Sequence, residues 1–328
     1  MPPRDRLQEA LTGLARVRHD PSSPASLAEL RRVLAHESAH AVAKAAAIVG
    51  EAGLDSLVPD LISCFRRFFS APARKDSGCA AKQAAVEALL RVDHEDEDVF
   101  RAGIRHVQLE PVFGGQVDSA VDLRGACALG LARTSRTDVL DLLAELLADP
   151  EPPARVSAAR AIAAHGRVAA TPLLRHKALA GDEEPRVVSE CLLALLQLDA
   201  RGSLPFVAAL LEPATPHGRP APDRVPCAAT ALGESRLKEA FPVLREWYPK
   251  AAARRLGRTA LLAVAALRRD EAFDYLLSLV RAAEPPEACD AAVALASQRD
   301  EALRGRAREA AAGRPEVAAT LERALRSA

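Results

Sequence analysis

The sequence predicts an all-α fold built from repeated helical hairpins, and three observations carry this prediction. Alanine-rich segments that end in a small residue and an aliphatic one recur eight times, from AAAIVG at 45–50 to AAVALA at 291–296. Each belongs to a pair of apolar runs with helical period, such as VLDLLAELLAD and ARVSAARAIAAHG, separated by aspartate, proline or glycine. No convincing β-strand is found. Paired helices are therefore the expected building block.

One aliphatic residue in each recurrence serves as a reference position for measuring the repeat. The spacings between successive reference positions are 40, 42, 31, 33, 37, 32 and 31 residues. The basic unit is thus about 32 residues, with three longer copies. The reference positions are Val49, Leu89, Leu131, Ile162, Leu195, Leu232, Val264 and Leu295.

Other residue types recur at fixed offsets from the reference positions. A proline follows four of them by ten residues, an aspartate precedes four by thirteen, and a base precedes three by seven. Fixed offsets of this kind are the signature of a repeat architecture. The residues are Pro59, Pro172, Pro205 and Pro242; Asp76, Asp118, Asp149 and Asp182; and Lys82, Arg124 and Arg155.

This register places a first and a second helix in every repeat. Each recurring proline falls near the start of a first helix, where its missing N–H does least harm. We expect a capping segment at 1–25, the array at 26–298 and capping helices at 299–328. First helices are expected within 26–36, 54–70, 95–109, 136–148, 168–180, 200–211, 236–248 and 271–282. Second helices are expected within 40–50, 79–91, 121–133, 154–166, 186–198, 224–234, 251–268 and 286–298.

The segments LRGACALGL, ARVSAARAI and DEEPRVVSECLLAL resemble hairpins of the HEAT-repeat family, in particular its phycobilin-lyase-like members. The resemblance covers roughly 26–298 and implies a right-handed α-solenoid of about eight to nine hairpins, with second helices on the concave face. It also implies a ladder between neighbouring repeats, made by the turn aspartate and the following base. Val188 occupies one arginine position, and the last three hairpins have neither residue. The implied ladder members are Asp76, Lys82, Asp118, Arg124, Asp149, Arg155 and Asp182.

The segment HESAH at 36–40 matches the H-E-x-x-H signature of zinc metalloproteases. That signature requires both histidines on one face of a continuous helix. His36, however, lies thirteen residues before Val49, at the position that later repeats give to the turn aspartate. The motif is therefore expected to cross a helix boundary. We interpret it as coincidental, and predict no catalytic residue, metal or cofactor.

Three hairpins carry insertions between their first and second helices, at 70–78, 109–118 and 212–222. Such connections emerge along one edge of a solenoid, and loops on a rigid scaffold commonly carry recognition. The segment 109–118 offers a carboxylate, an aromatic ring and an amide in Glu110, Phe113 and Gln116. We predict that it contacts a partner. The alternative is that Phe113 fills the groove between two hairpins as a plug.

Charge gives a second indication of a partner. The chain has 44 Lys or Arg and 44 Asp or Glu, which argues against nucleic acid or an anionic membrane. The expected second helices nevertheless carry thirteen bases against six acids. Their densest basic run contains Arg254, Arg255 and Arg258. These arginines predict a site for an acidic peptide or protein surface.

The N-terminus lacks the apolar core of a secretory signal, and no stretch is apolar enough to span a membrane. Six well-separated cysteines without a C-x-x-C pair indicate small buried side chains rather than a metal or redox centre. These features predict a cytoplasmic protein.

The leading functional prediction is a non-enzymatic scaffold that binds another protein through the concave second-helix face and the rim of inserted loops. A second hypothesis is DNA binding or base excision, since some alkylpurine DNA glycosylases are built from HEAT-like repeats. A third is a bilin-lyase-like protein, because related repeats occur in phycobilin lyases. The neutral charge and the single tryptophan disfavour the second hypothesis.

Overall fold

The computed structural model describes residues 3–94, 97–134, 136, 138–212 and 224–327. This part of the chain forms 19 α-helices, four short 3₁₀ helices and one two-stranded sheet. The helices belong to two compact units, Met1–His165 and Gly166–Ala328. No described helix is both long and apolar enough to cross a membrane.

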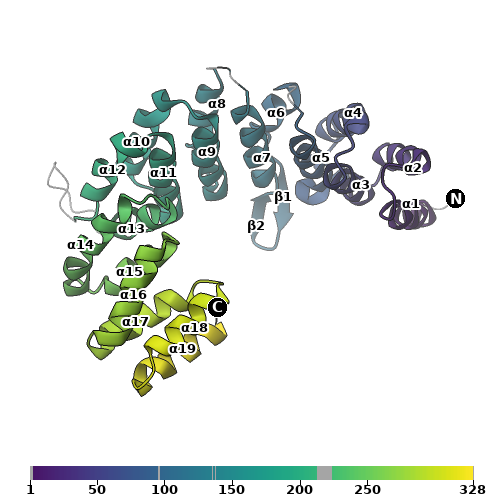
Figure 1. Cartoon of the computed structure of the whole chain (residues 1–328). Helices are drawn as coiled ribbons and strands as arrows, with labels where there is room; N and C mark the ends of the chain where they lie inside the picture. Colours follow the sequence, from purple (N-terminus) through teal and green to yellow (C-terminus); the bar gives the residue numbers. More distant parts are fainter. Residues whose placement is uncertain (1–2, 95–96, 135, 137, 213–223, 328) are drawn as a thin grey trace. The chain divides into compact units, whose positions relative to one another are not determined.

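The N-terminal unit consists of two layers of helices (Figure 1). The second helices α3, α5, α7 and α9 pack on one another in order, while α2, α4, α6 and α8 cover them and α1 packs against α2 and α3. The bounds are α1 (Pro3–Val17), α2 (Pro24–Leu34), α3 (Ala39–Glu51), α4 (Val58–Phe69), α5 (Ala80–Arg91), α6 (Glu97–Gly103), α7 (Val121–Ala132), α8 (Val139–Leu146) and α9 (Pro152–His165).

The C-terminal unit repeats the same arrangement. Its second helices α11, α13, α15, α17 and α19 pack in order, and each contacts the first helix of its own hairpin. The predicted all-α, solenoid-type repeat fold is therefore confirmed in each unit. The bounds are α10 (Thr171–Ala180), α11 (Pro185–Leu198), α12 (Ala200–Ala209), α13 (Arg224–Glu234), α14 (Ala240–Ala253), α15 (Gly257–Ala266), α16 (Asp270–Ala282), α17 (Pro285–Ala296), α18 (Glu301–Ala310) and α19 (Pro315–Ser327).

Small residues allow the second helices to approach closely in both units. A Cβ added at Gly50 of α3 would lie 2.9 Å from the Cα of Ala88 in α5. A Cβ at Gly233 of α13 would lie 2.4 Å from the carbonyl oxygen of Ala263 in α15. Neither contact is possible for a larger residue without movement of a backbone, which explains part of the alanine and glycine content of these helices.

Arginines bind the C-terminal carbonyl groups of helices that precede them in the chain. The last carbonyls of a helix have no partner within that helix, so an external donor satisfies them. These bonds join consecutive repeats in both units. The pairs are Arg67 with Leu34 and His36, Arg133 with Leu90, Arg224 with Leu179, and Arg314 with Val280 and Ala283.

Three sequence predictions about elements are corrected. The segment 109–118 is not a loop but a β-hairpin of β1 (Leu109–Val112) and β2 (Gly115–Asp118). Helix α6 ends at Gly103 instead of reaching 109. The expected second helix at 251–268 begins only at Gly257, because α14 continues to Ala253 and ends in a left-handed turn at Arg255 (φ 62°). Of the insertion at 212–222, residues 213–222 lie outside the described part of the chain.

Candidate functional site

The HESAH segment lies at a helix boundary. Helix α2 ends at Leu34 and α3 begins at Ala39, so His36 belongs to the turn and His40 to the next helix. Nδ1 of His36 accepts a hydrogen bond from the Ser38 N–H at 3.0 Å. The two imidazoles are therefore not stacked one turn apart on a continuous helix. Among the described residues, no three histidine, cysteine or acidic side chains are grouped as metal ligands.

The β-hairpin exposes a concentration of apolar side chains. Strands β1 and β2 are antiparallel, with Glu110 opposite Val117 and Val112 opposite Gly115. Gly114 takes a φ of 88° in the turn between them, a conformation that favours glycine. Five apolar residues here are 48–109% exposed, and we call them the hairpin patch: Val107, Leu109, Val112, Phe113 and Val117.

Phe113 lies at the tip of the hairpin and is 109% exposed. The alternative that its ring plugs a groove between repeats is therefore wrong. Gln116, on β2, is also exposed. Figure 1 shows the hairpin beside α7, extending past the ends of the neighbouring helices of the N-terminal unit.

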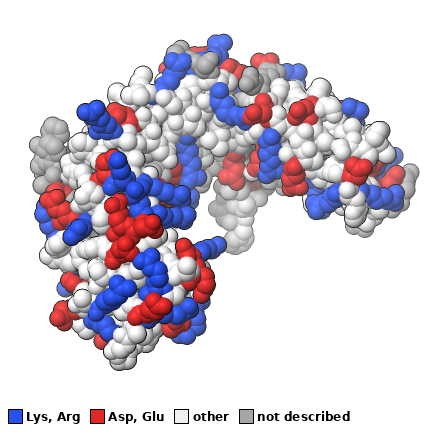
Figure 2. Space-filling view, viewed as in Figure 1, with Lys and Arg blue, Asp and Glu red and all other residues white. Residues whose placement is uncertain are grey.

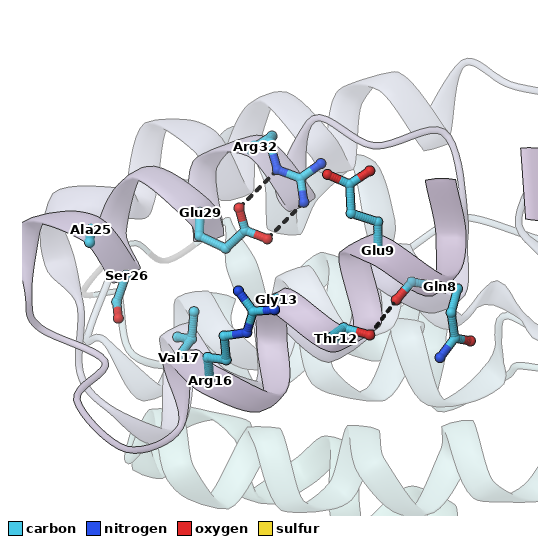
Figure 3. A pocket seen from close by; sticks show the side chains of 10 residues that line it. All are labelled: Gln8, Glu9, Thr12, Gly13, Arg16, Val17, Ala25, Ser26, Glu29 and Arg32. Atoms are coloured by element: carbon cyan, nitrogen blue, oxygen red, sulfur yellow. Dashed lines mark hydrogen bonds and ion pairs between the residues drawn. The ribbon is translucent and has the colours of Figure 1, made fainter. Parts of the chain in front are cut away.

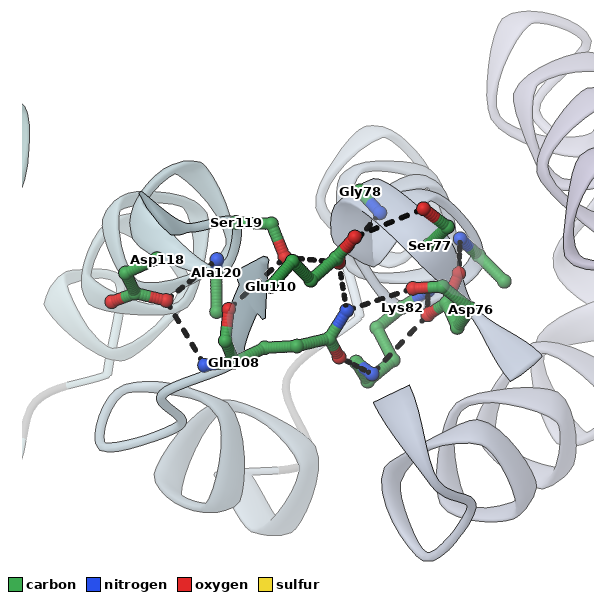
Figure 4. A network of polar contacts seen from close by, with 10 residues as sticks. Asp76, Ser77, Gly78, Lys82, Gln108, Glu110, Asp118, Ser119 and Ala120 are labelled. Atoms are coloured by element: carbon green, nitrogen blue, oxygen red, sulfur yellow. Dashed lines mark hydrogen bonds and ion pairs between the residues drawn. The ribbon is translucent and has the colours of Figure 1, made fainter. Parts of the chain in front are cut away.

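A buried polar cluster holds the base of the hairpin against the preceding insertion (Figure 4). Lys82 Nζ lies 3.3 Å from Asp76 Oδ2 and 2.5 Å from Gln108 Oε1. The Asp76 carboxylate also accepts hydrogen bonds from the N–H groups of Ala81 and Lys82. The Asp76 and Lys82 side chains are each 1% exposed, so their opposite charges and shared hydrogen bonds compensate one another inside the protein.

Glu110 lies in the same cluster rather than on the free surface of the hairpin. Its carboxylate accepts hydrogen bonds from Ser77 Oγ at 2.9 Å and Gly78 N at 2.7 Å, in the insertion before α5. It also accepts from Ser119 Oγ at 2.6 Å and Gln108 Nε2 at 2.7 Å. These bonds, the one from Ser119 foremost, lower the pKa of Glu110 to about 2. Glu110 therefore joins two adjacent insertions through these bonds.

Arg124 connects the hairpin to the next repeat. Its guanidinium lies 2.5 Å from Asp118 Oδ2 and 2.8 Å from Asp149 Oδ2, and its side chain is 2% exposed. Asp118 also accepts hydrogen bonds from Gln108 N and Ala120 N, one on each side of the hairpin. Arg155 donates to the backbone carbonyls of Asp149 and Pro150. Charged and backbone groups thus form a continuous path from the hairpin base to α9.

Asp182 has a different partner from the other turn aspartates. Val188 stands where the earlier repeats have a base, and the Asp182 carboxylate lies 2.8 Å from Lys177 Nζ of α10 instead. The Asp182 side chain is 3% exposed and the Lys177 side chain 22%. This ion pair joins the last turn of α10 to the turn that leads into α11.

The arginines predicted as an acidic-peptide site do not form one basic face. Arg254 and Arg255 lie between α14 and α15, and only Arg258 is on the second helix α15. Arg254 lies 3.0 Å from Glu212, and Arg258 lies 2.7 Å from Asp290. An open groove of about 690 Å³ there is lined by Arg255 and Arg258 but also by Glu287 and Asp290. Two of the three arginines thus already have carboxylate partners.

A second groove, of about 670 Å³, lies between α1 and α2 (Figure 3). Arg32 donates two hydrogen bonds to the Glu29 carboxylate, at 2.8 and 2.7 Å. The hydrogen bond from Arg32 lowers the pKa of Glu29. Acid and base thus compensate one another in this groove. In the face that Figure 2 shows, basic and acidic side chains are interspersed in the same way.

No protein-family model and no curated protein matches the chain. Two of the solved structures with similar chains are human deoxyhypusine hydroxylase in complex with glycerol and an engineered protein. The hydroxylase is 18% identical with a TM-score of 0.28, over 88% of this chain and 96% of its own. The engineered protein is 14% identical with a TM-score of 0.35, over 98% of this chain and 93% of its own. At these values neither an activity nor a ligand can be inferred from the likeness.

Proposed function

We propose that this chain is a helical-repeat scaffold that binds a protein partner through the hairpin patch. The observation that carries the proposal is the exposure of Val107, Leu109, Val112, Phe113 and Val117 on one short projection. Single exposed apolar residues are ordinary, but five of them on one short projection are a concentration typical of an interaction site. Burial of such a group against an apolar surface of a partner is favourable because it removes that area from water.

The base of the hairpin supports this proposal. Glu110 and Gln108 fix the hairpin to the preceding insertion through hydrogen bonds of 2.7–2.9 Å. On the other side, Asp118 pairs with Arg124, which also pairs with Asp149 before the next second helix. A projection that is already ordered loses little conformational freedom when it binds, so more of the burial energy remains for affinity. The resemblance to HEAT repeats agrees with a role as a scaffold, since stacked hairpins present loops along one rim.

Protein binding is favoured over nucleic-acid binding by the placement of the aromatic residues and charges. Trp247 and Tyr248 are only 4% and 6% exposed, so neither ring is available to stack on a base. Arg254 and Arg258 have carboxylate partners, and basic and acidic side chains are interspersed on the face that Figure 2 shows. The exposed aromatic ring at Phe113 lies among aliphatic residues, not among bases.

The test is quantitative affinity capture from extract of the native cell with three forms of the full chain. These are the wild type, Phe113→Ala and the control Val168→Thr, which changes an apolar side chain that is 54% exposed in the C-terminal unit. We expect the wild type and the control to retain a protein that Phe113→Ala loses. The melting temperature of Phe113→Ala should be nearly unchanged, because the ring is fully exposed.

Each protein so identified would be purified and titrated against the three forms by calorimetry. Equal affinity for the wild type and Phe113→Ala would contradict the proposal. A large loss of melting temperature in Phe113→Ala would also contradict it, since the ring would then support the fold.

A further inference from the structure

The backbone of the hairpin leaves the outer edge of β2 open. Ser119 N donates to Gln108 O at 2.9 Å, which makes these two residues a hydrogen-bonded pair. Because paired residues alternate along an antiparallel ladder, Leu109 with Asp118 and Pro111 with Gln116 are non-hydrogen-bonded pairs. The N–H and C=O groups of Gln116 and Asp118 therefore point away from β1. Strand β2 pairs only with β1 in the described chain.

The outer edge of β1 is blocked by two features. Pro111 occupies an outward-facing position and has no N–H to donate. Glu110, on β1, binds Ser77 and Gly78 of the preceding insertion. Gln108, just before β1, binds the backbone carbonyl of Asp76 in the same insertion. Only the β2 edge is thus able to accept another strand.

We infer that β2 pairs with β2 of a second copy of this chain, antiparallel about a two-fold axis at Val117. This inference rests on the proposed function, since it names one partner of the hairpin patch. Gln116 of one copy then lies opposite Asp118 of the other, and their backbones exchange hydrogen bonds on both sides of the axis. The two Val117 side chains meet at the centre as a non-hydrogen-bonded pair, the closer of the two pair types.

The chemistry of β2 favours a second copy as its occupant. In this register no two like charges are opposite each other, because Asp118 faces an amide and valine faces valine. Val112 and Val117 lie on one sheet face, together with Glu110, so the pairing brings the valines of both copies onto the same face. The blocked β1 edges end the assembly at a four-stranded sheet of two chains. A symmetric, closed dimer results rather than a fibre.

The contact is small, and this determines its strength. Stable interfaces bury roughly 1,200–2,000 Å² in total. Two four-residue strands with their exposed valines provide less than that. The pairing is therefore reversible and depends on protein concentration.

Cysteine cross-linking tests the register. Five of the six native cysteines are buried, and burial raises the pKa of Cys64, Cys79 and Cys191 to about 12, so these thiols react slowly. Cys289 is only half-buried. The cross-linking variants are therefore made in a Cys289→Ser background. In this background Val117→Cys places two thiols in a non-hydrogen-bonded pair, with Cβ atoms about 4.5–5.5 Å apart before adjustment. A disulfide needs about 3.5–4.5 Å. Gln116→Cys is the matched control on the adjacent position, facing the other side of the sheet.

After mild oxidation, the fraction of covalent dimer is read from a non-reducing gel. We expect Val117→Cys to give several-fold more dimer than Gln116→Cys. Equal yields, or no dimer from Val117→Cys, would overturn the inference.

Sedimentation equilibrium of the unmodified chain gives an independent test. The average mass should rise towards that of a dimer over roughly a hundredfold range of concentration. Gln116→Pro removes one N–H from the open edge, at a position paired with Pro111, and should remain monomeric with an unchanged helical circular dichroism spectrum. A dimer that persists in Gln116→Pro would refute β2 pairing.

A wild type that is monomeric throughout would also refute the pairing, but it would leave the proposed function standing if Phe113→Ala still loses a captured protein. Failure of both experiments would remove the hairpin patch as an interaction site altogether.

Discussion

The N-terminal and C-terminal units use the same helical hairpin but differ in how their repeats are joined. Between residues 76 and 155 the N-terminal unit buries four charged residues, Asp76, Lys82, Arg124 and Arg155. Among the described residues of the C-terminal unit, Ser203 is the only buried polar residue. Its Asp182 carboxylate pairs with Lys177, which remains partly exposed. Stacking of alanine-rich second helices therefore builds this unit with an ion pair at the turn in place of the buried charge cluster of the N-terminal unit.

The buried ions of the N-terminal unit lie where the β-hairpin leaves the array. A buried ion pair contributes little net stability, because removing two charges from water offsets their attraction. Its geometry is nevertheless specific, since each charge needs a correctly placed partner. We interpret the Asp76, Lys82 and Arg124 contacts as fixing the position of the hairpin rather than as adding stability to the stack.

The largest effect is expected from Arg124→Met. This change leaves the buried carboxylates of Asp118 and Asp149 without their shared cation, which costs about 3–5 kcal/mol. The free energy of unfolding from urea titration measures it. Arg258→Met is the control, because Arg258 and Asp290 form an exposed pair worth about 0–1 kcal/mol. Similar losses in the two variants would remove the distinction between the units.

Gly233→Ala probes the feature that both units share. The added methyl group would meet the carbonyl oxygen of Ala263 at 2.4 Å, and a backbone atom cannot rotate away. We expect a loss of about 1–3 kcal/mol in the free energy of unfolding. Gly305→Ala is the control, since nothing lies within 4 Å of a Cβ at that position. A neutral Gly233→Ala would show that α13 and α15 can separate without cost.

Asp182→Asn tests whether the turn of the C-terminal unit that corresponds to Asp76, Asp118 and Asp149 depends on its ion pair as the N-terminal turns do. The change keeps the size of the side chain and removes its charge opposite Lys177. Because Lys177 keeps access to water, we expect a loss of only about 1 kcal/mol in urea titration. A loss as large as that of Arg124→Met would mean that this turn depends on its ion pair as strongly as the hairpin base does.

The smallest effect is expected from Glu110→Gln, because the bonds of its carboxylate to Ser77 and Gly78 are open to water, which screens them. This effect should depend on pH. The hydrogen bonds to Glu110 lower its pKa from 4.5 to about 2 in the folded protein. A carboxyl group whose pKa is lower in the folded than in the unfolded protein stabilises the fold at pH values above its unfolded-state pKa. This stabilisation is lost as the pH falls through its folded-state pKa. The stability gap between wild type and Glu110→Gln should therefore be widest above pH 4.5 and close towards pH 2. A gap that does not change with pH would contradict the charged role of Glu110.

Sequence periodicity was sufficient to place most helices. Reference positions such as Val49 and Leu232 lie on the buried side of α3 and α13, because one residue per repeat must fill the same site between stacked helices. The offset of His36 from Val49 likewise predicted the helix boundary inside HESAH. These features depend on local spacing, which the sequence states directly.

The hairpin and the roles of its residues depend on contacts that spacing does not contain. Val112 and Val117 flank the segment Phe113-Gly114-Gly115-Gln116, whose glycines are a turn signal that indicates a β-hairpin. The segment is nevertheless too short for a clear alternation of apolar and polar residues. Glu110 binds Ser77 and Gly78, more than thirty residues earlier. Arg254 pairs with Glu212, 42 residues away. No pattern within one repeat predicts such partners.

The direction of the arginine-to-carbonyl bonds has a consequence for synthesis on the ribosome. In the pairs made by Arg67, Arg133, Arg224 and Arg314, the donor follows the acceptor by 31 to 45 residues. A helix that has left the exit tunnel therefore keeps open carbonyls until roughly one more repeat has been translated. At these four junctions the later repeat therefore completes the helix end of the earlier one, and folding there follows the order of synthesis.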